Sequence, residues 1–335
     1  MSKQFRLIIA VVLALGSTLQ SYAQDPQFSQ FYANPLYLSP AFAGSTQCGR
    51  LNLNYRNQWP GLSNAYATYN VSYDQSLPGI NSGFGLLVMS DQQGDGALSR
   101  TSAAAFYVYK LRVSEPIIIN FGVKAGFYQE HLNWDKLFFA DQINSATGEI
   151  SGPTNETPRL SFAVSVVDFS VGAIMTYFDI FNVGIAVDHL TQPQLSFYDN
   201  PDSKIDMKIT GHGSVNINIT QGMLGGYDPD DIMLQPSILY MQQGKFHQLN
   251  AGLYVNKYPF VVGAYYRHNF QNPDAVIALI GLKFDNVRFG YSYDATMSNV
   301  GGKAGGAHEI SLAWDFCIYK EQKRRRIRAI SAPSF

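Results

Sequence analysis

Residues 25–44 read DPQFSQFYANPLYLSPAFAG. This run is apolar and rich in proline, and the rest of the chain must supply a structure on which it can dock. Pro26, Pro35 and Pro40 break any long helix and remove donors from any strand. An apolar segment that cannot satisfy its own backbone must lie against structure built by the rest of the chain. We therefore predict that this run docks on, or plugs, whatever follows it. Its candidate contact residues are Phe28, Phe31, Tyr32, Asn34, Pro35, Leu36 and Phe42.

Downstream of this run, apolar and polar residues alternate with a period close to two, which is typical of half-buried strands. Leu51, Leu53 and Tyr55 alternate with Asn52 and Asn54. Each such segment has about ten residues, which is long enough to cross a bilayer at a tilt. The same alternation recurs at residues 68–73, 214–219, 287–294 and 309–316.

We count about fourteen strands, and an even number suits a closed antiparallel barrel with no edge open to lipid. The links support this, because tight turns near residues 113–116, 178–180, 256–259 and 284–286 alternate with longer links such as residues 131–160, 190–205 and 295–307. Short turns face the periplasm in outer-membrane barrels, which places both chain ends there. Residues 221–230 make one longer link on the short side. The expected strands lie near residues 49–57, 64–74, 81–91, 98–112, 115–129, 164–178, 180–189, 206–220, 231–243, 246–256, 259–270, 274–284, 287–296 and 307–317.

Composition and the first residues favour an exported membrane protein. Charged residues make up 15% of the chain and aromatic residues 14%, and a net charge of -1 implies no general attraction to nucleic acid. Lys3 and Arg6 precede an apolar run at residues 7–15, and Ala23 closes a small-residue cleavage site. We expect a signal peptide, with Gln24 as the first mature residue. No later apolar run has the length of a membrane helix, so a membrane form must be a barrel.

A soluble β-sandwich or a lipocalin-like barrel would also have alternating strands. The strands are too many and too regular for one sandwich, although periodicity alone does not tell the two faces apart. The signal peptide and the link asymmetry favour an all-β, closed antiparallel transmembrane barrel in the outer membrane. The expected divisions are a signal peptide at 1–23, a periplasmic or lumenal segment at 24–47, the barrel at 48–317, and a basic periplasmic tail at 318–335.

Three runs carry a resemblance to a known family: residues 25–44, YRNQWPG at residues 55–61, and AHEISL at residues 307–312. They resemble the PorP/SprF family of outer-membrane proteins of the type IX secretion system, the exporter and surface-anchoring machine of gliding and related bacteria. The resemblance implies a non-enzymatic protein that helps deliver or anchor secreted cargo, such as gliding adhesins, at the cell surface. The implied partners are cargo with a C-terminal sorting domain, periplasmic lipoproteins of the system, and outer-membrane lipid.

Two other functions stay open. An outer-membrane porin or a substrate-specific channel is compatible with polar inner faces, which every plain barrel has. An outer-membrane hydrolase would need a Ser/His/acid group, but the 6 histidines are scattered, and Gly211-His212-Gly213-Ser214 lacks the Gly-x-Ser-x-Gly elbow. No spacing of histidines or cysteines is typical of a metal site. We therefore predict no catalytic, cofactor-binding or metal-binding residue.

Three segments are candidate partner sites. The N-terminal segment is either a loosely ordered periplasmic lead-in or a plug in the lumen, and its prolines lower the entropic cost of the second arrangement. The loop at residues 131–160 holds Trp134, Phe138 and Phe139, which either form a protein-docking surface or pack into the barrel mouth. The C-terminal tail is basic with an apolar end, and it contacts either lipid heads and cell-wall polymer or a periplasmic protein. Its basic candidates are Lys323, Arg324, Arg325 and Arg326.

The 2 cysteines lie at the two ends of the expected barrel. Cys48 precedes the first strand and Cys317 closes the last, so they become neighbours when the barrel closes. The alternation points both side chains inward. A disulfide across this seam is feasible in the oxidising periplasm, unless strand stagger separates the two ends.

Overall fold

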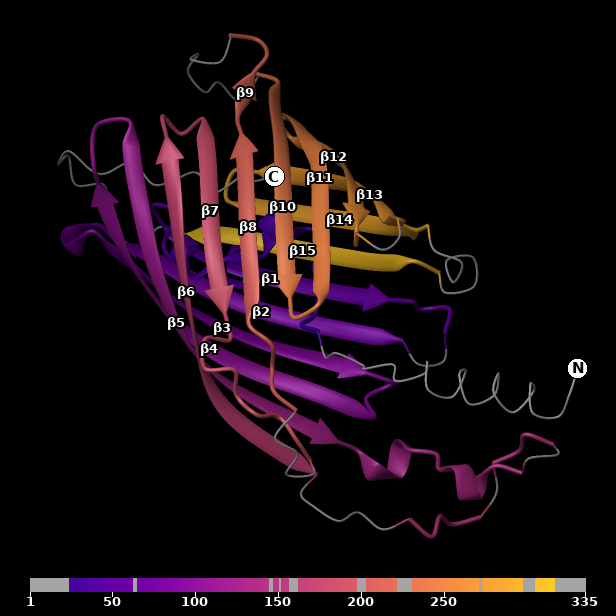
Figure 1. The fold of residues 1–335 in the computed structure, drawn as a ribbon. Helices are drawn as coiled ribbons and strands as arrows, with labels where there is room; N and C mark the ends of the chain where they lie inside the picture. Colours follow the sequence, from indigo (N-terminus) through magenta and orange to yellow (C-terminus); the bar gives the residue numbers. More distant parts are fainter. Residues whose placement is uncertain are drawn as a thin grey trace, which may run out of the picture.

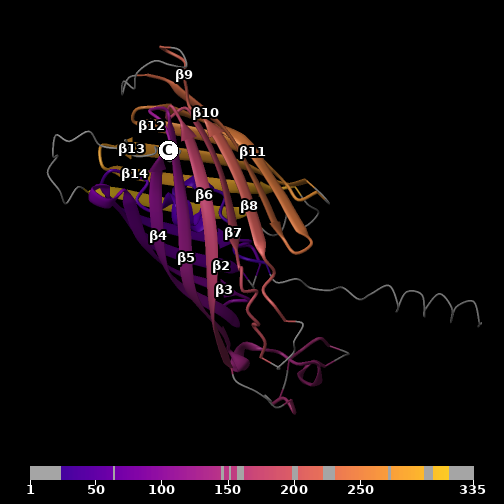
Figure 2. The same ribbon diagram turned by 60° about the vertical axis from the view of Figure 1, so that its left-hand side comes forward.

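The strands form a single antiparallel sheet that curls round and closes on itself (Figures 1 and 2). In this computed structural model the described residues are 24–62, 65–144, 147–150, 152–156, 162–197, 203–221, 231–270, 273–297 and 305–316. The expected signal peptide and basic tail lie outside them. Within the described residues, no helix has both the length and the apolar character needed to cross a membrane.

The strands follow one another around the ring in chain order, and β1 pairs with β15 to close it. The two-residue β9 pairs with β10 in line with β8, so the wall has fourteen strands, as predicted. The strands are β1 (Gly49–Gln58), β2 (Tyr66–Leu77), β3 (Ser82–Gln93), β4 (Leu98–Arg112), β5 (Ile117–Leu132), β6 (Ala163–Tyr177), β7 (Phe181–Asp188), β8 (Lys208–Val215), β9 (Ile217–Asn218), β10 (Met233–Gln243), β11 (Phe246–Lys257), β12 (Phe260–His268), β13 (Pro273–Phe284), β14 (Val287–Thr296) and β15 (Ala307–Phe316).

The two faces of the wall are confirmed as apolar outside and polar inside. On β1, Leu53 is exposed on the outer surface, while Asn52, Asn54 and Arg56 are buried toward the lumen. The sequence alternation determines this, because neighbouring side chains of a strand point to opposite faces. The outer surface is apolar around the ring, as shown by Val71, Val88, Val123, Val167, Val183, Ile185, Val262, Ile280 and Leu312.

The two ends of the barrel differ in their links, and we name them for this difference. At the short-turn end, where β1 begins and β15 ends, residues 78–81, 113–116, 178–180, 258–259 and 285–286 make tight turns. The opposite, long-loop end carries residues 133–162, 189–207 and 297–306. Tight turns also occur there, at residues 94–97 and 244–245, so the predicted asymmetry is less regular than expected.

The strand expected at residues 206–220 is interrupted at Asn216, between β8 and β9. The backbone N–H of Asn216 donates to the carbonyl of Ile180 at 2.8 Å, and its side chain donates to the carbonyl of Asp179 at 2.9 Å. Its amide oxygen accepts from Gln235 at 2.6 Å. These contacts come from the turn between β6 and β7 and from β10, so the local alternation did not reveal the break.

Candidate functional site: the lumenal segment

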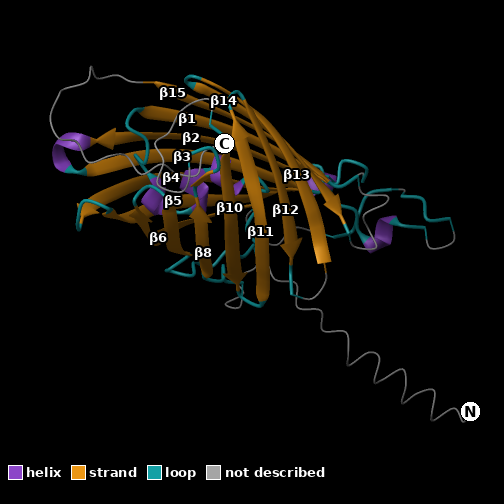
Figure 3. Cartoon of the chain, turned by 90° about the horizontal axis from the view of Figure 1, so that it is seen from above, coloured by secondary structure: helices purple, strands orange, loops and turns teal. Residues whose placement is uncertain are grey.

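Residues 24–44, which we call the lumenal segment, run through the inside of the barrel from the long-loop end to the short-turn end. Short helices lie within the curve of the strands in the view from above (Figure 3). The segment makes three single turns, η1 (Phe31–Ala33), α2 (Pro35–Leu38) and η2 (Pro40–Phe42). Pro35 and Pro40 each occupy the first position of a turn, where a missing N–H does no harm. The prolines thus limit each helix to one turn and let the chain change direction.

Apolar side chains of the segment pack against two parts of the wall. On one side Phe31, Tyr32, Leu38 and Phe42 join a cluster with Tyr254 and Tyr265, among other buried residues of β10 to β13. On the other side Phe28 and Leu36 join a cluster with wall residues of β3 and β4. All seven candidate residues predicted here, including Asn34 and Pro35, are buried.

Three polar clusters hold the segment along its length, and the first lies at the long-loop end. The carboxylate of Asp25 accepts from Nζ of Lys208 at 2.9 Å and lies 2.9 Å from Nε2 of His189. NH1 of Arg100 lies 3.6 Å away, and the N–H of Asp25 donates to Gln243 at 3.0 Å. We call Asp25, Arg100, His189 and Lys208 the Asp25 cluster. Residues 24–28 therefore lie at the long-loop end, whereas β15 ends at the short-turn end. The expectation that both chain ends lie on the same side of the barrel does not hold for residues 24–28.

The charges of the Asp25 cluster stabilise one another. Burial alone would raise the pKa of Asp25, but His189 and Lys208 hold it well below its usual range. Burial alone would lower the pKa of His189, but Asp25 and the hydrogen bond to Asp168 raise it to about 9. His189 is therefore charged at neutral pH, with a carboxylate on each ring nitrogen.

This arrangement predicts a pH-dependent loss of stability. A group whose pKa rises on folding stabilises the folded state fully below its unfolded pKa of about 6.5, and the effect is lost as pH rises through its folded pKa. The difference in free energy of unfolding between wild type and His189→Gln should therefore shrink by roughly 3 kcal/mol from about pH 6 to pH 10. Urea unfolding in detergent measures it, and a difference that stays constant over this range would contradict the prediction. Tyr128, Asp168 and Lys208 face His189 in both proteins.

The second cluster binds the backbone of the segment to the seam of the barrel. Glu309 accepts from the N–H of Ser29 at 2.7 Å and from that of Gln30 at 3.1 Å. Arg56 forms ion pairs with Glu309 at 3.2 Å and with Asp294 at 2.9 Å, and it donates to Oγ of Ser29 at 2.7 Å. These five residues, the Arg56 cluster, are all buried. Because β1, β14 and β15 each supply one charge, the segment contributes to closing the ring.

The third cluster lies at the short-turn end. The N–H of Gly44 donates to Asp74 at 2.8 Å, and Arg50 pairs with the same carboxylate at 2.9 Å. Lys110 donates to the carbonyl of Gly44 and, at 2.7 Å, to Ser76. Gly44 has a φ of +64°, a left-handed conformation that favours glycine.

Glycines of the wall leave room for the backbone of the segment. A Cβ added to Gly83 would lie 2.6 Å from the carbonyl oxygen of Ala43, and one added to Gly172 would lie 2.6 Å from Oγ of Ser39. A Cβ on Gly122 would lie well inside 3.0 Å of the backbone of Pro40 and Ala41. Three separate strands thus carry glycine where the segment passes closest.

Gly122→Ala should therefore displace the segment. The new methyl group meets backbone atoms, which cannot rotate away, so we expect a destabilisation of about 1–3 kcal/mol. Gly211→Ala is the matched control, because a Cβ there meets nothing within 4 Å. Unfolding midpoints in detergent and protease sensitivity of the segment measure the effect. Equal behaviour of the two variants would show that the fit at Gly122 is unimportant.

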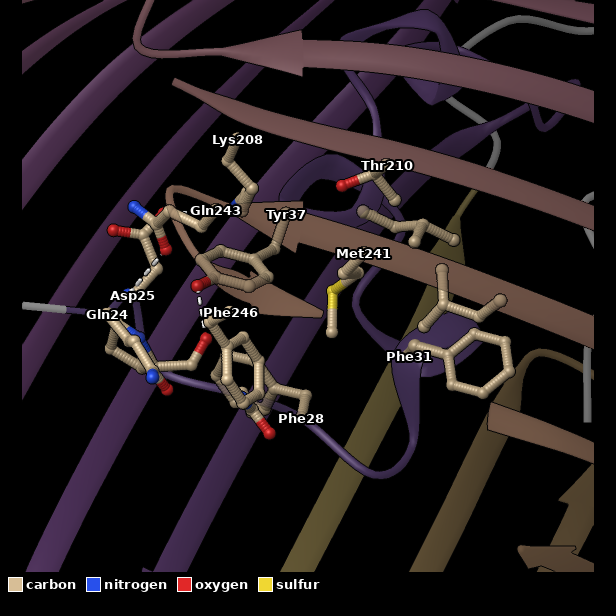
Figure 4. A pocket seen from close by; sticks show the side chains of 14 residues that line it. Gln24, Asp25, Phe28, Phe31, Tyr37, Lys208, Thr210, Met241, Gln243 and Phe246 are labelled. Carbon is tan, nitrogen blue, oxygen red and sulfur yellow. Dashed lines mark hydrogen bonds and ion pairs between the residues drawn. The ribbon is translucent and has the colours of Figure 1, made fainter. Parts of the chain in front are cut away.

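Two recesses lie beside the start of the segment. The first, of about 550 Å³ including open solvent, is lined by apolar side chains such as Phe28, Met241 and Phe246 and by polar Lys208 and Gln243 (Figure 4). The second, of about 450 Å³ on the same measure, lies toward β3 to β5. Both are bounded by Asp25, Pro26, Tyr37 and Lys208.

The other predicted site residues lie apart from the lumen. Trp134 and Phe139 pack together with ring centroids 4.7 Å apart, while the side chain of Phe138 is 66% exposed. The link that contains them projects beyond the barrel in both side views (Figures 1 and 2). Cys48 is disulfide-bonded, but Cys317 lies outside the described residues and the pairing stays a prediction. Lys323, Arg324, Arg325 and Arg326 also lie outside the described residues.

The polar clusters and the glycines were not predicted. Charged residues at inward positions of strands, such as Arg56, Arg100 and Glu309, were the available sign, because a charge facing a lumen needs a partner. Their partners are far away in sequence, so alternation within one strand did not identify them. No group of three or more His, Cys, Asp and Glu side chains among the described residues is arranged to hold a metal ion.

Solved structures share this fold at low sequence identity. The chain is similar to the toluene transporter TbuX of Ralstonia pickettii, with a TM-score of 0.50 and 10% identity over 84% of this chain and 93% of that one. It is also similar to a mutant of the monoaromatic hydrocarbon channel TodX, with a TM-score of 0.50 and 11% identity over 84% of this chain and 94% of that one. These identities show the fold alone, that of an outer-membrane barrel.

The sequence itself matches one protein family over most of its length. No curated protein matches the chain. The family described as type IX secretion system membrane protein PorP/SprF matches residues 20–314. Both the family and the barrel fit an outer-membrane location. The chain therefore belongs to the PorP/SprF family of type IX secretion system membrane proteins.

Proposed function

We propose that this protein is a non-enzymatic component of the type IX secretion system that helps deliver or anchor secreted cargo at the cell surface. Membership of the PorP/SprF family carries the proposal. The lumenal segment supports an anchoring role over a diffusion role, because it runs through the lumen and is held at three places. A passage for free solutes would instead need a hydrated path between the two ends.

In this proposal the long-loop end faces outward and meets cargo with a C-terminal sorting domain, such as a gliding adhesin. Phe138, Ile143 and Ile150 support it, because they expose apolar surface on the projecting link. The short-turn end and residues 318–335 then face the periplasm and its lipoproteins, and the apolar outer surface faces lipid. A signal peptide at residues 1–23 would bring the chain to this location.

The absence of catalysis is part of the proposal. The most enclosed histidine, His189, lies between the carboxylates of Asp168 and Asp25, which stabilise its charged form. A general base beside a serine or cysteine nucleophile would need a free ring nitrogen. The contacts of His189 therefore suit a salt bridge that joins the wall to Asp25.

Deleting the gene should leave one or a few surface proteins undelivered, while small-solute uptake stays unchanged. Surface proteomics and uptake assays measure the two effects, and the wild-type gene supplied in trans is the control. A pull-down of the intact protein from detergent then identifies the partner. Normal surface proteins together with lost nutrient permeability would reverse the assignment.

A substrate-specific channel is the second candidate, and two observations favour it. The barrels to which this chain is similar include a toluene transporter and a monoaromatic hydrocarbon channel. The recess lined by Phe28, Met241 and Phe246 would suit an apolar solute. Uptake of labelled toluene by cells with and without the gene distinguishes this function from anchoring.

A further inference from the structure

Three cationic donors converge on one carboxylate at the long-loop end. Arg100 comes from β4, His189 follows β7 and Lys208 begins β8. Nζ of Lys208 and Nε2 of His189 both lie 2.9 Å from Oδ2 of Asp25, while NH1 of Arg100 lies 3.6 Å from Oδ1. Each donor is less than a tenth exposed. The wall thus presents a preformed receptor for a carboxylate, which the lumenal segment occupies with its own side chain.

The wall holds these donors in place without the lumenal segment. Glu130 accepts from Nε and NH2 of Arg100 at 3.1 and 2.9 Å, and Asp168 contacts Nδ1 of His189 at 2.8 Å. Asp188 lies 3.7 Å from Nζ of Lys208. Nζ of Lys208 and Nε2 of His189 also contact Asp25, and NH1 of Arg100 lies 3.6 Å from it, so its removal leaves a gap with positive charges around it.

The same carboxylate separates two recesses that are lined largely by apolar side chains. Leu239, Met241 and Phe246 lie on one side, and Leu87 and Phe106 lie on the other. Asp25, Pro26, Tyr37 and Lys208 line both recesses, and Figure 4 shows Asp25, Tyr37 and Lys208 at the first. If residues 24–27 withdraw, the recesses join, and the three cationic donors face the joined space.

We propose that Arg100, His189 and Lys208 form a binding site for a carboxylate attached to an apolar group, and that Asp25 occupies this site in the closed barrel. The donors would bind the carboxylate, and one of the recesses would hold the apolar group. This chemistry occurs at the C-terminal residue of a polypeptide and in a short fatty acid. Asp25 acts as a competitor attached to the chain.

The local contacts allow such an exchange. Beyond the Asp25 cluster, residues 24–27 are held by the N–H of Asp25 on Gln243 and by the carbonyl of Pro26, which accepts from Tyr37. The next anchors are Phe28, which is buried against β3 and β4, and Ser29, in the Arg56 cluster. The start of the segment can therefore leave the site while Ser29 keeps the rest in the lumen.

Calorimetric titration of the purified full-length protein in detergent tests the proposal. The probes are N-acetyl-L-phenylalanine for a peptide C-terminus, hexanoate for a fatty acid, and N-acetyl-L-phenylalanine amide as a neutral control. An attached competitor acts at millimolar effective concentration or above, so Asp25→Ala should bind a carboxylate probe about tenfold more tightly than wild type. The probe that responds identifies the source of the ligand.

Asp135→Ala removes an exposed carboxylate from the projecting link and should bind as wild type does. Adding Lys208→Met to Asp25→Ala should weaken binding about tenfold, the usual effect of losing a charged hydrogen bond. Heat-modifiable mobility on gels shows whether Asp25→Ala folds. If it does not fold, Asp25→Asn replaces it in the titration, because this variant keeps the side-chain shape and removes the charge. Equal binding of the amide, or no gain when the carboxylate of Asp25 is removed, would overturn the proposal.

Discussion

Removing residues 26–44 should convert a barrel that passes no steady current into an open pore. The lumenal segment runs through the bore from the Asp25 cluster to Asp74 at the short-turn end, and the wall behind it is polar. Buried side chains such as Asn52, Asn120 and Thr210 would then face water. A wall of about fourteen strands without its plug leaves room for a hydrated path, since slightly larger barrels are open channels.

Planar-bilayer recordings measure this effect. A deletion of equal length from the projecting link, residues 138–156, is the matched control and should stay silent. Heat-modifiable mobility on gels shows whether each barrel has folded, because the deletion also removes buried apolar contacts. Silence of a folded barrel without the segment, or steady openings of the intact protein, would contradict the structure of a filled lumen.

Much of the wall was predictable, because its pattern is local. Alternation within one strand determines which side chains face lipid, and Leu53 and Val71 lie outside as Asn52 and Asn70 lie inside. The break at Asn216 was not predictable, because its partners are Asp179, in the turn between β6 and β7, and Gln235, on β10. Strand ends shifted for the same reason, since ladder pairing and not hydropathy determines where a strand stops.

The path of the lumenal segment was only partly predictable. Its prolines and aromatic residues indicated docking, and the single turns at Pro35 and Pro40 are consistent with this. Its direction depends on pairings such as Asp25 with Lys208 and Ser29 with Glu309, which are separated by 183 and 280 residues. The sequence alone does not explain the glycine at position 122, because the reason for it is the close approach of Pro40 and Ala41.

Arg56→Met should destabilise the protein by roughly 3–5 kcal/mol, the effect of removing one partner from a buried ion pair. Arg56 is 3% exposed and lies between Asp294 and Glu309, which are both buried. Arg267 pairs with Asp294 at 2.9 Å and is kept in the variant, so we expect Glu309 to bear most of the loss. Among the described residues, the carboxylate of Glu309 then accepts only from the N–H groups of Ser29 and Gln30, and no positive charge compensates its own charge.

Denaturant unfolding in detergent measures the loss, and Arg112→Met is the matched control. Arg112 pairs with Glu115 at 3.1 Å on the surface, where such pairs contribute about 0–1 kcal/mol. Adding Glu309→Gln to Arg56→Met should restore part of the stability, because an amide keeps an acceptor for Ser29 without a buried charge. If the double variant is no more stable than Arg56→Met, the loss comes from packing of the arginine stem and not from an uncompensated carboxylate. The seam would then be held mainly by β1–β15 pairing, and the lumenal segment would contribute to closure through its apolar contacts alone.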